Sequence, residues 1–163
     1  MKVIQINNAR DNVNTVVVIN GWVYNSRRSG KIGFLSIRDG FAVMQCIVEK
    51  KTVGDEMFDM FKSLTQESSI SVTGKIVENE RAIGGYELLL SDLEVHQLST
   101  DYPITPKEHG PDFLMNNRHL WLRSKRQHAI LKVRHEIIKS IRSFFDNNDF
   151  TLVDTPIFTP NAA

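Results

Sequence analysis

The chain has 163 residues, of which 41% are hydrophobic and 24% charged, a composition typical of folded globular proteins. Its formal net charge of +1 gives no argument for nucleic-acid binding, and its single cysteine excludes an intramolecular disulfide and a cysteine-based zinc site. No apolar run approaches the ~18 residues that a membrane span requires, and the N-terminus lacks the apolar core of a signal peptide. These features favour a cytoplasmic chain that does not enter a membrane.

The first hundred residues are predicted to form mostly strands. A long run rich in β-branched and aromatic residues covers 15–28, and a Ser-Gly-Lys turn separates it from an alternating strand over 31–38. An Asp-Gly turn then leads to a third strand over 41–50. Residues 68–80 and 85–98 return to strand character on the two sides of a glycine-containing turn.

A helix is predicted between the third and fourth strands. In residues 54–64 the apolar side chains recur at helical spacing. Three strands, a helix and two strands fit the five-stranded Greek-key barrel called the OB-fold, whereas an SH3-like barrel would lack the helix. We therefore expect a mainly β protein, with an OB-fold barrel and one helix over residues 1–100.

The remaining residues have a different character. Residues 101–125 contain three prolines close together and are predicted to form a linker or hinge. A long amphipathic helix follows, with Asn147 and Asn148 as its end, and then a strand over 150–160 that Pro156 interrupts. Because one helix and one strand bury little apolar surface, residues 126–163 are expected to be the start of a truncated α+β domain.

One face of the second strand carries the first candidate site. The apolar residues of 31–38 fall on one face, and Phe34 and Arg38 fall on the other. Aromatic side chains on this part of an OB-fold stack unpaired bases. Phe34 is therefore a candidate base platform, with Arg38, Arg27 or Arg28 on phosphates or base edges and Gln45 on a Watson–Crick edge. The pattern alone equally allows Phe34 to pack beneath a loop with the arginines solvated.

Three other features are less specific. Residues 118–134 hold six lysines or arginines and no acid, which predicts either contact with an RNA backbone or, as we favour, a solvated basic helix face. Glu87, the one acid in an otherwise apolar stretch, fits an edge or solvent position better than a base reader. The five histidines form no metal motif, and no Walker lysine loop, GxSxG or HExxH occurs. We predict no catalytic residue and no metal site.

Three stretches carry a family resemblance in the right order: GWVYNSRRSGKIGFLSIRDG, RHLWLRSKRQHAILKVRHEII and FTLVDTPIFTP. Together they resemble the N-terminal part of class II aminoacyl-tRNA synthetases of the aspartate, asparagine and lysine subgroup. The stretch YPITPKEHGPDFLMNNRHLWLRSKRQHAI is most similar to asparaginyl-tRNA synthetases of the bacterial type. The resemblance implies an anticodon-binding OB-fold, a hinge and a catalytic domain. The first motif of that domain, the helix over 127–149 and the strand with Pro156, would form the homodimer interface.

The resemblance also assigns roles to particular residues. It implies that Phe34 stacks on the central anticodon uridine and that Gln45 contacts the same base. Arg27 matches an arginine of the first loop, and Glu87 matches a glutamate that contacts the first anticodon base. Phe34 and Gln45 were already candidates from their face and chemistry, whereas Glu87 gains its role from the resemblance alone.

The ATP-binding motifs 2 and 3 of the family do not occur in these residues. We therefore expect a fragment that binds the anticodon loop of tRNA(Asn) without catalysis. The intact enzyme would activate asparagine with ATP and Mg²⁺ and transfer it to tRNA. Two alternatives remain open: an aspartyl-tRNA synthetase, including one that charges both tRNAs, because the two anticodons share the central uridine, and a stand-alone single-strand-binding OB protein. The helix and strand after the barrel argue against the second.

Overall fold

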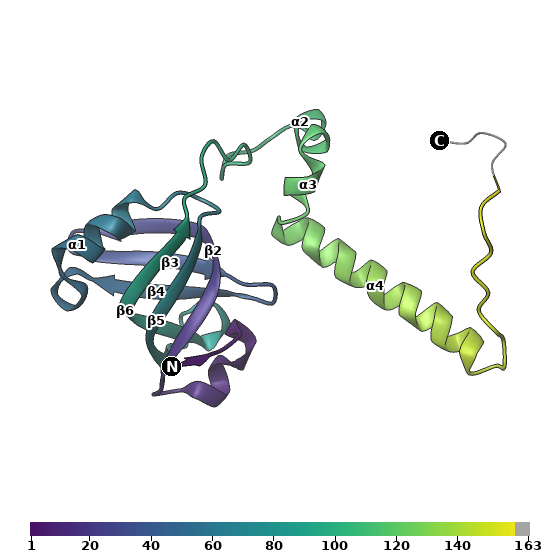
Figure 1. Ribbon diagram of the computed structural model, residues 1–163, viewed down its shortest axis with the longest axis horizontal. Coiled ribbons are helices and arrows are strands. Elements are labelled where there is room, and N and C mark those ends of the chain that lie inside the picture. Colours follow the sequence, from purple (N-terminus) through teal and green to yellow (C-terminus); the bar gives the residue numbers. More distant parts are fainter. Residues whose placement is uncertain (159–163) are drawn as a thin grey trace. The chain divides into compact units, whose positions relative to one another are not determined.

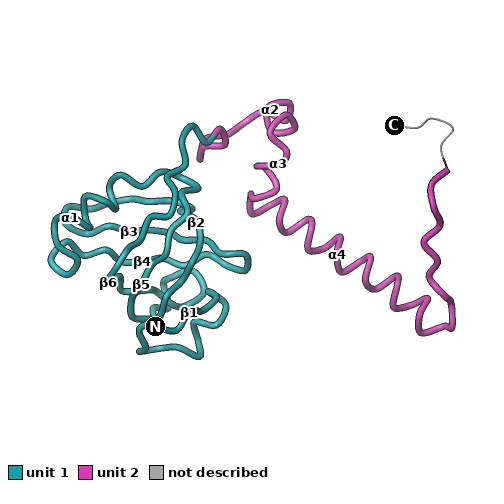
Figure 2. Tube along the Cα trace, in the orientation of Figure 1, with its two compact units in different colours: residues 1–102 teal, residues 103–163 magenta. Residues whose placement is uncertain are grey.

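A computed structural model describes residues 1–158 of the chain. They divide into two compact units, the first comprising residues 1–102 and the second beginning at residue 103 (Figure 2).

The first unit is a mixed sheet with one α-helix and two 3-10 helices, η1 (Ile6–Asn12) and η2 (Ile83–Gly85) (Figure 1). Its strands are β1 (Lys2–Val3), β2 (Val16–Ser29), β3 (Ile32–Arg38), β4 (Val43–Glu49), β5 (Ser69–Glu78) and β6 (Tyr86–Gln97). The order in the sheet is β1-β2-β3-β4-β6-β5, and β2 also pairs with β5. Strands β2 to β6 therefore form a closed ring of pairings, antiparallel except for β4 and β6, which run parallel. The predicted OB-fold is confirmed.

Strand β2 closes this ring because it pairs along both of its edges. Residues 16–22 pair with β5, and residues 22–29 pair with β3. The register with β3 shifts between Val23 and Asn25, which marks a β-bulge. A bulge bends a strand and increases its twist, so one strand serves both sides of the barrel.

The core lies inside the ring and is built by alternation along every strand. In β3, Gly33, Leu35 and Ile37 are buried, whereas the residues between them are half-buried. The largest fully buried side chains are Phe58, Ile19, Leu35, Ile37, Met44, Ile70, Ile76, Leu88, Val17, Val23, Val48 and Val72. No buried side-chain nitrogen or oxygen within residues 1–158 lacks a hydrogen-bond partner.

The N-terminal elements were not predicted from the sequence. Strand β1 pairs with β2, and the 3-10 helix η1 (Ile6–Asn12) places Ile6 in the core. The backbone N–H of Ile6 donates to Asp39 Oδ2 at 2.7 Å. Asp39 Oδ1 accepts from the N–H groups of Phe41 and Ala42, so the predicted Asp-Gly turn between β3 and β4 also anchors η1.

The predicted helix between the third and fourth strands of the barrel is confirmed as α1 (Lys50–Ser63). It begins earlier than expected, and Gly54 interrupts it with φ 83, a backbone conformation that favours glycine. Phe58 and Phe61 are buried and hold the second part of the helix against the barrel. The packing of these two rings therefore fixes α1, which has no side-chain hydrogen bond at its N-cap.

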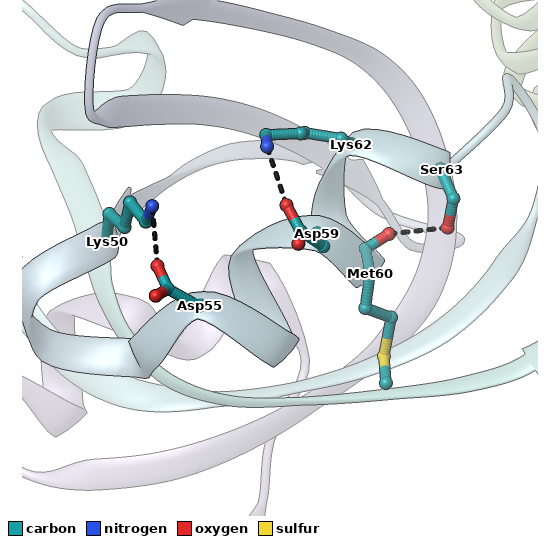
Figure 3. A network of polar contacts seen from close by, with 6 residues as sticks. All are labelled: Lys50, Asp55, Asp59, Met60, Lys62 and Ser63. Atoms are coloured by element: carbon teal, nitrogen blue, oxygen red, sulfur yellow. Dashed lines mark hydrogen bonds and ion pairs between the residues drawn. The ribbon is translucent and has the colours of Figure 1, made fainter.

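Two ion pairs lie along α1, and their carboxylates are largely exposed (Figure 3). Lys50 Nζ lies 2.5 Å from Asp55 Oδ1 across the break at Gly54, and Lys62 Nζ lies 2.6 Å from Asp59 Oδ1. The hydrogen bond and charge of Asp55 raise the pKa of Lys50, and those of Lys62 lower the pKa of Asp59. Such exposed pairs are screened by solvent and contribute little to stability.

The second unit begins with two short helices and continues into a long one. These are α2 (Pro111–Asn116), α3 (Arg118–Trp121) and α4 (Lys125–Asp146). The linker expected over 101–125 is therefore partly helical, and Pro111 occupies a first-turn position where its missing N–H costs nothing. Helix α4 begins after Ser124, whose Oγ accepts from the N–H of Gln127, and it ends at the predicted asparagines with Asn147 as its C-cap.

The prediction of a strand over 150–160 is wrong for residues 150–158. Residues 150–158 form no strand, and 159–160 lie outside the described residues. A strand needs a neighbour to accept its hydrogen bonds, and the second unit up to residue 158 contains no other strand.

Within residues 1–158, no helix combines the length and the apolar character needed to cross a bilayer.

Candidate nucleic-acid interface

The predicted base platform, Phe34, lies on the outer face of β3. It is half-buried, and its neighbours Gly33 and Leu35 are buried on the core side. The guanidinium carbon of Arg27 lies 4.7 Å from the centre of the Phe34 ring, a distance at which a cation interacts with an aromatic face. Phe34 thus presents its ring on the outside of the barrel, partly covered by one exposed arginine.

The strand register brings the predicted site residues into one row. Arg27 on β2 pairs with Phe34 on β3, Ser36 pairs with Gln45 on β4, and Gln45 pairs with Glu87 on β6. Phe34 and Gln45 are diagonal neighbours, so their side chains lie within reach of each other on the same face. Four residues from separate parts of the sequence therefore cross four adjacent strands on the outside of the barrel.

Glu87 does not occupy a solvent position. It is 8% exposed, and Gln45 Nε2 donates a hydrogen bond to Glu87 Oε1 at 2.6 Å. The edge or solvent position that its surroundings in the sequence favoured is therefore wrong, because the parallel pairing of β4 with β6 places the carboxylate beside Gln45.

Of the other arginines considered for this site, Arg38 has a different partner. Its Nη2 lies 2.7 Å from Glu67 Oε2, and the side chains are 16% and 4% exposed. An arginine paired with a buried carboxylate is held for packing and charge balance, and its removal would leave Glu67 uncompensated. Arg28 is exposed on β2 and pairs with Gly33, so the ring of Phe34 has Arg27 and not Arg38 against it.

Two further aromatic side chains on β2 were missed. Trp22 is 41% exposed and Tyr24 38% exposed, with buried Val23 between them. Trp22 pairs with Arg38, so this aromatic surface continues the outer face of β2 and β3. The alternation of β2 carried the signal, because both residues fall opposite its core positions.

The single cysteine lies directly beneath the row. Cys46 follows Gln45 on β4, and its side chain points into the core with no exposure. Burial, and to a smaller extent the charge of Glu87, raises the pKa of its thiol well above the usual range. Cys46 is therefore a protonated core residue and not a nucleophile.

The remaining predicted features lie in the second unit. The basic side chains of 118–134 are exposed on α3, α4 and the turn between them, and Pro156 is exposed in the irregular segment after α4. No group of three or more His, Cys, Asp or Glu side chains in residues 1–158 could hold a metal ion.

Two family profiles match the sequence of the chain. The OB-fold nucleic acid binding domain matches residues 17–95, and the class II tRNA synthetases (D, K and N) match residues 110–163. The asparagine–tRNA ligase of Sorangium cellulosum (strain So ce56) is 56% identical over 151 residues, which cover 92% of this chain and 34% of that protein. The chain is a homologue of asparaginyl-tRNA synthetases. It spans about a third of the length of such a relative.

Solved structures of synthetases share the fold. Asparaginyl-tRNA synthetase from Pyrococcus horikoshii, complexed with asparaginyl-adenylate, has a TM-score of 0.87 at 35% identity, covering 94% of this chain and 36% of that one. Aspartyl tRNA synthetase from Entamoeba histolytica has a TM-score of 0.81 at 20% identity, covering 96% and 39%. The second likeness shows the fold alone. The profile match over 110–163 also argues against a stand-alone OB protein.

Proposed function

We propose that this chain is the tRNA-recognition part of an asparagine–tRNA ligase. Its outer row would bind the anticodon loop of tRNA(Asn). The observation that carries the proposal is the row itself: a half-buried ring, a hydrogen-bonding amide and a guanidinium on the outer face of an OB-fold. Aromatic rings in such positions stack unpaired bases, and amides read their edges.

The proposed roles follow the chemistry of each side chain. Phe34 would stack on the central anticodon uridine, and Gln45 would contact the edge of that base. Arg27, stacked on Phe34, would move from the ring face and contact the RNA backbone or the stacked base. Glu87 would contact the first anticodon base and keep its hydrogen bond with Gln45.

For the intact protein we propose the activity that its relatives' names describe. It would activate asparagine with ATP and Mg²⁺ in the cytoplasm and transfer it to tRNA(Asn). The family's ATP-binding motifs 2 and 3 do not occur in this sequence, and we propose that other residues of the intact protein supply them. The 163-residue chain alone should therefore show no asparagine-dependent pyrophosphate exchange above buffer, and clear exchange would contradict this part of the proposal.

We also propose that the intact protein is a homodimer formed through α4 and the segment with Pro156. Support comes from the exposed apolar side chains of α4, which include Ile130, Leu131, Ile137, Ile138, Ile141, Phe144 and Phe145. Contiguous apolar surface of this kind marks an interaction site. Light scattering should show concentration-dependent association of the full chain, and no association of a version that ends at Thr100. Strictly monomeric behaviour of both would contradict self-association of this chain through α4.

The anticodon proposal is tested by removing the ring. Phe34→Ala should weaken binding of an anticodon stem-loop by about 1–3 kcal/mol, the loss expected for one stacked base. Fluorescence anisotropy with a labelled stem-loop measures this loss, and circular dichroism checks the fold. Phe41→Ala is the matched control, because Phe41 is 52% exposed in the turn after β3 and lies outside the row. Equal binding by both variants, each folded, would refute the role of Phe34.

A further inference from the structure

We propose that Glu87 fixes the orientation of the Gln45 amide and thereby makes this face select uridine over cytidine at the base stacked on Phe34. This inference rests on the proposed anticodon function. It gives Glu87 a positioning role on the central base, in addition to any contact with the first base.

The chemistry of the two side chains decides which way the amide points. A carboxylate accepts hydrogen bonds and donates none, whereas an amide has two donors on nitrogen and one acceptor oxygen. The amide atom 2.6 Å from Glu87 Oε1 must therefore be Nε2. The opposite orientation would place Gln45 Oε1 against Glu87 Oε1, two acceptors with no hydrogen between them, at a residue that is only 8% exposed.

The backbone supports this orientation. Three consecutive pairs, Gln45 with Glu87, Cys46 with Leu88 and Ile47 with Leu89, join β4 to β6. Cys46 and Leu88 have no exposure and anchor both strands in the core. The register of β4 with β6 therefore holds Gln45 and Glu87 opposite each other. The hydrogen bond between them then fixes the orientation of the amide.

Fixing Nε2 leaves Gln45 Oε1 turned away from the carboxylate. Within residues 1–158, Oε1 makes no hydrogen bond to any side chain or backbone group, and Gln45 is only half-buried. The site thus presents one unused acceptor on the outer face, one strand away from the ring of Phe34.

An unused acceptor at this place distinguishes the pyrimidines. Uridine carries a hydrogen on N3 and can donate it to Oε1, whereas N3 of cytidine is itself an acceptor and would face Oε1 lone pair to lone pair. A free amide could rotate and offer its NH₂ group to cytidine, but the bond to Glu87 prevents this. We expect a uridine preference of about tenfold or more, since an unsatisfied polar pair costs 1–3 kcal/mol.

The test compares anticodon stem-loops that differ only in the central base. The wild-type chain should bind the uridine form about tenfold or more tightly than the cytidine form. Glu87→Gln replaces the carboxylate with a group that can accept or donate, so the Gln45 amide can turn over. The uridine-to-cytidine ratio should then fall toward one, with cytidine binding improved.

Glu78→Gln is the matched control. It makes the same substitution at an exposed residue on β5, adjacent to β6, and it removes the same charge without touching Gln45. This variant should keep the wild-type ratio. An unchanged ratio in a folded Glu87→Gln variant, or an equal fall in both variants, would overturn the inference.

A second measurement needs no variant and remains decisive if Glu87→Gln does not fold. Stem-loops with N3-methyluridine at the central position lack the donor and should bind as weakly as the cytidine form. Pseudouridine retains N3–H and should bind like uridine. Tight binding of the N3-methyl form would overturn the inference, and a wild-type chain that binds the stem-loop no better than a scrambled loop would overturn the proposed function with it.

Discussion

The two units of the chain differ in how they obtain their stability. In residues 1–102 a closed ring of strands pairs its own backbone groups and surrounds a core that includes twelve fully buried large side chains. In the second unit, no residue up to 158 is buried, and α4 has its apolar side chains exposed. A closed sheet pairs the backbone hydrogen-bonding groups along all of its strand edges, whereas a single amphipathic helix depends on other elements to cover its apolar stripe.

This difference matters for the candidate site, because every member of the outer row belongs to the first unit. The row rests on strands whose inner faces are fully packed, so its geometry does not need the second unit. The part of the chain that matches a synthetase catalytic domain, residues 110–163, lies in the second unit. The proposed anticodon site and the segment that matches a synthetase profile thus lie in different units.

The largest expected effect comes from core truncation. Leu35→Ala removes a side chain with no exposure from the centre of the ring and should lower the free energy of unfolding by about 2–5 kcal/mol. Ile137→Ala, at a residue that is 54% exposed on α4, should change it by less than about 0.5 kcal/mol at concentrations where the chain is monomeric. Urea titration followed by circular dichroism measures both. Equal losses would mean that α4 is packed as tightly as the barrel.

A smaller effect should follow from added volume. A Cβ on Gly74 would meet the carbonyl oxygen of Leu89 and the side chain of Leu88, so Gly74→Ala should cost about 1–3 kcal/mol. Gly110, before α2, has open space around it, and Gly110→Ala should be within about 0.5 kcal/mol of wild type. Thermal unfolding of the two variants provides the comparison. A tolerated Gly74→Ala would show that β5 and β6 can separate locally.

The smallest effect concerns helix ends. Because α4 lacks a packed face within residues 103–158, its N-cap should matter, and Ser124→Ala should cost the helix about 1 kcal/mol. Ser140→Ala is the control: Ser140 Oγ donates to the carbonyl of Glu136 in mid-helix, and alanine is the better helix former. Amide hydrogen exchange across α4 should speed up only for Ser124→Ala. Unchanged exchange in that variant would show that packing and not capping fixes α4.

Much of the first unit could be predicted from the sequence because alternation and turn residues act locally. The faces of Phe34 and Gln45 follow from strand periodicity, and the row then follows from OB-fold register. Partners distant in the sequence could not be predicted: nothing near Arg38 identifies Glu67, which lies 29 residues away. The bond from Gln45 to Glu87 needs the parallel pairing of β4 with β6, which no local pattern encodes.

The errors have physical reasons as well. Strand β1 has two residues, too few for any periodicity to appear. The proline-rich connection suggested an irregular linker, although proline suits the first turn of a helix such as α2. The strand expected over 150–160 does not form in its described part, 150–158, because residues that favour strands need a neighbouring strand to pair with.

The single thiol of the chain, Cys46, can serve as a probe of barrel opening. Cys46 is enclosed by β3 on one side and β6 on the other, directly under the Gln45–Glu87 bond. An alkylating reagent can reach the buried thiol only when the barrel opens around it, so the modification rate reports on such openings. RNA bound to the outer row would slow this alkylation without contacting the sulfur. The mass added to Cys46 over time would therefore report RNA binding.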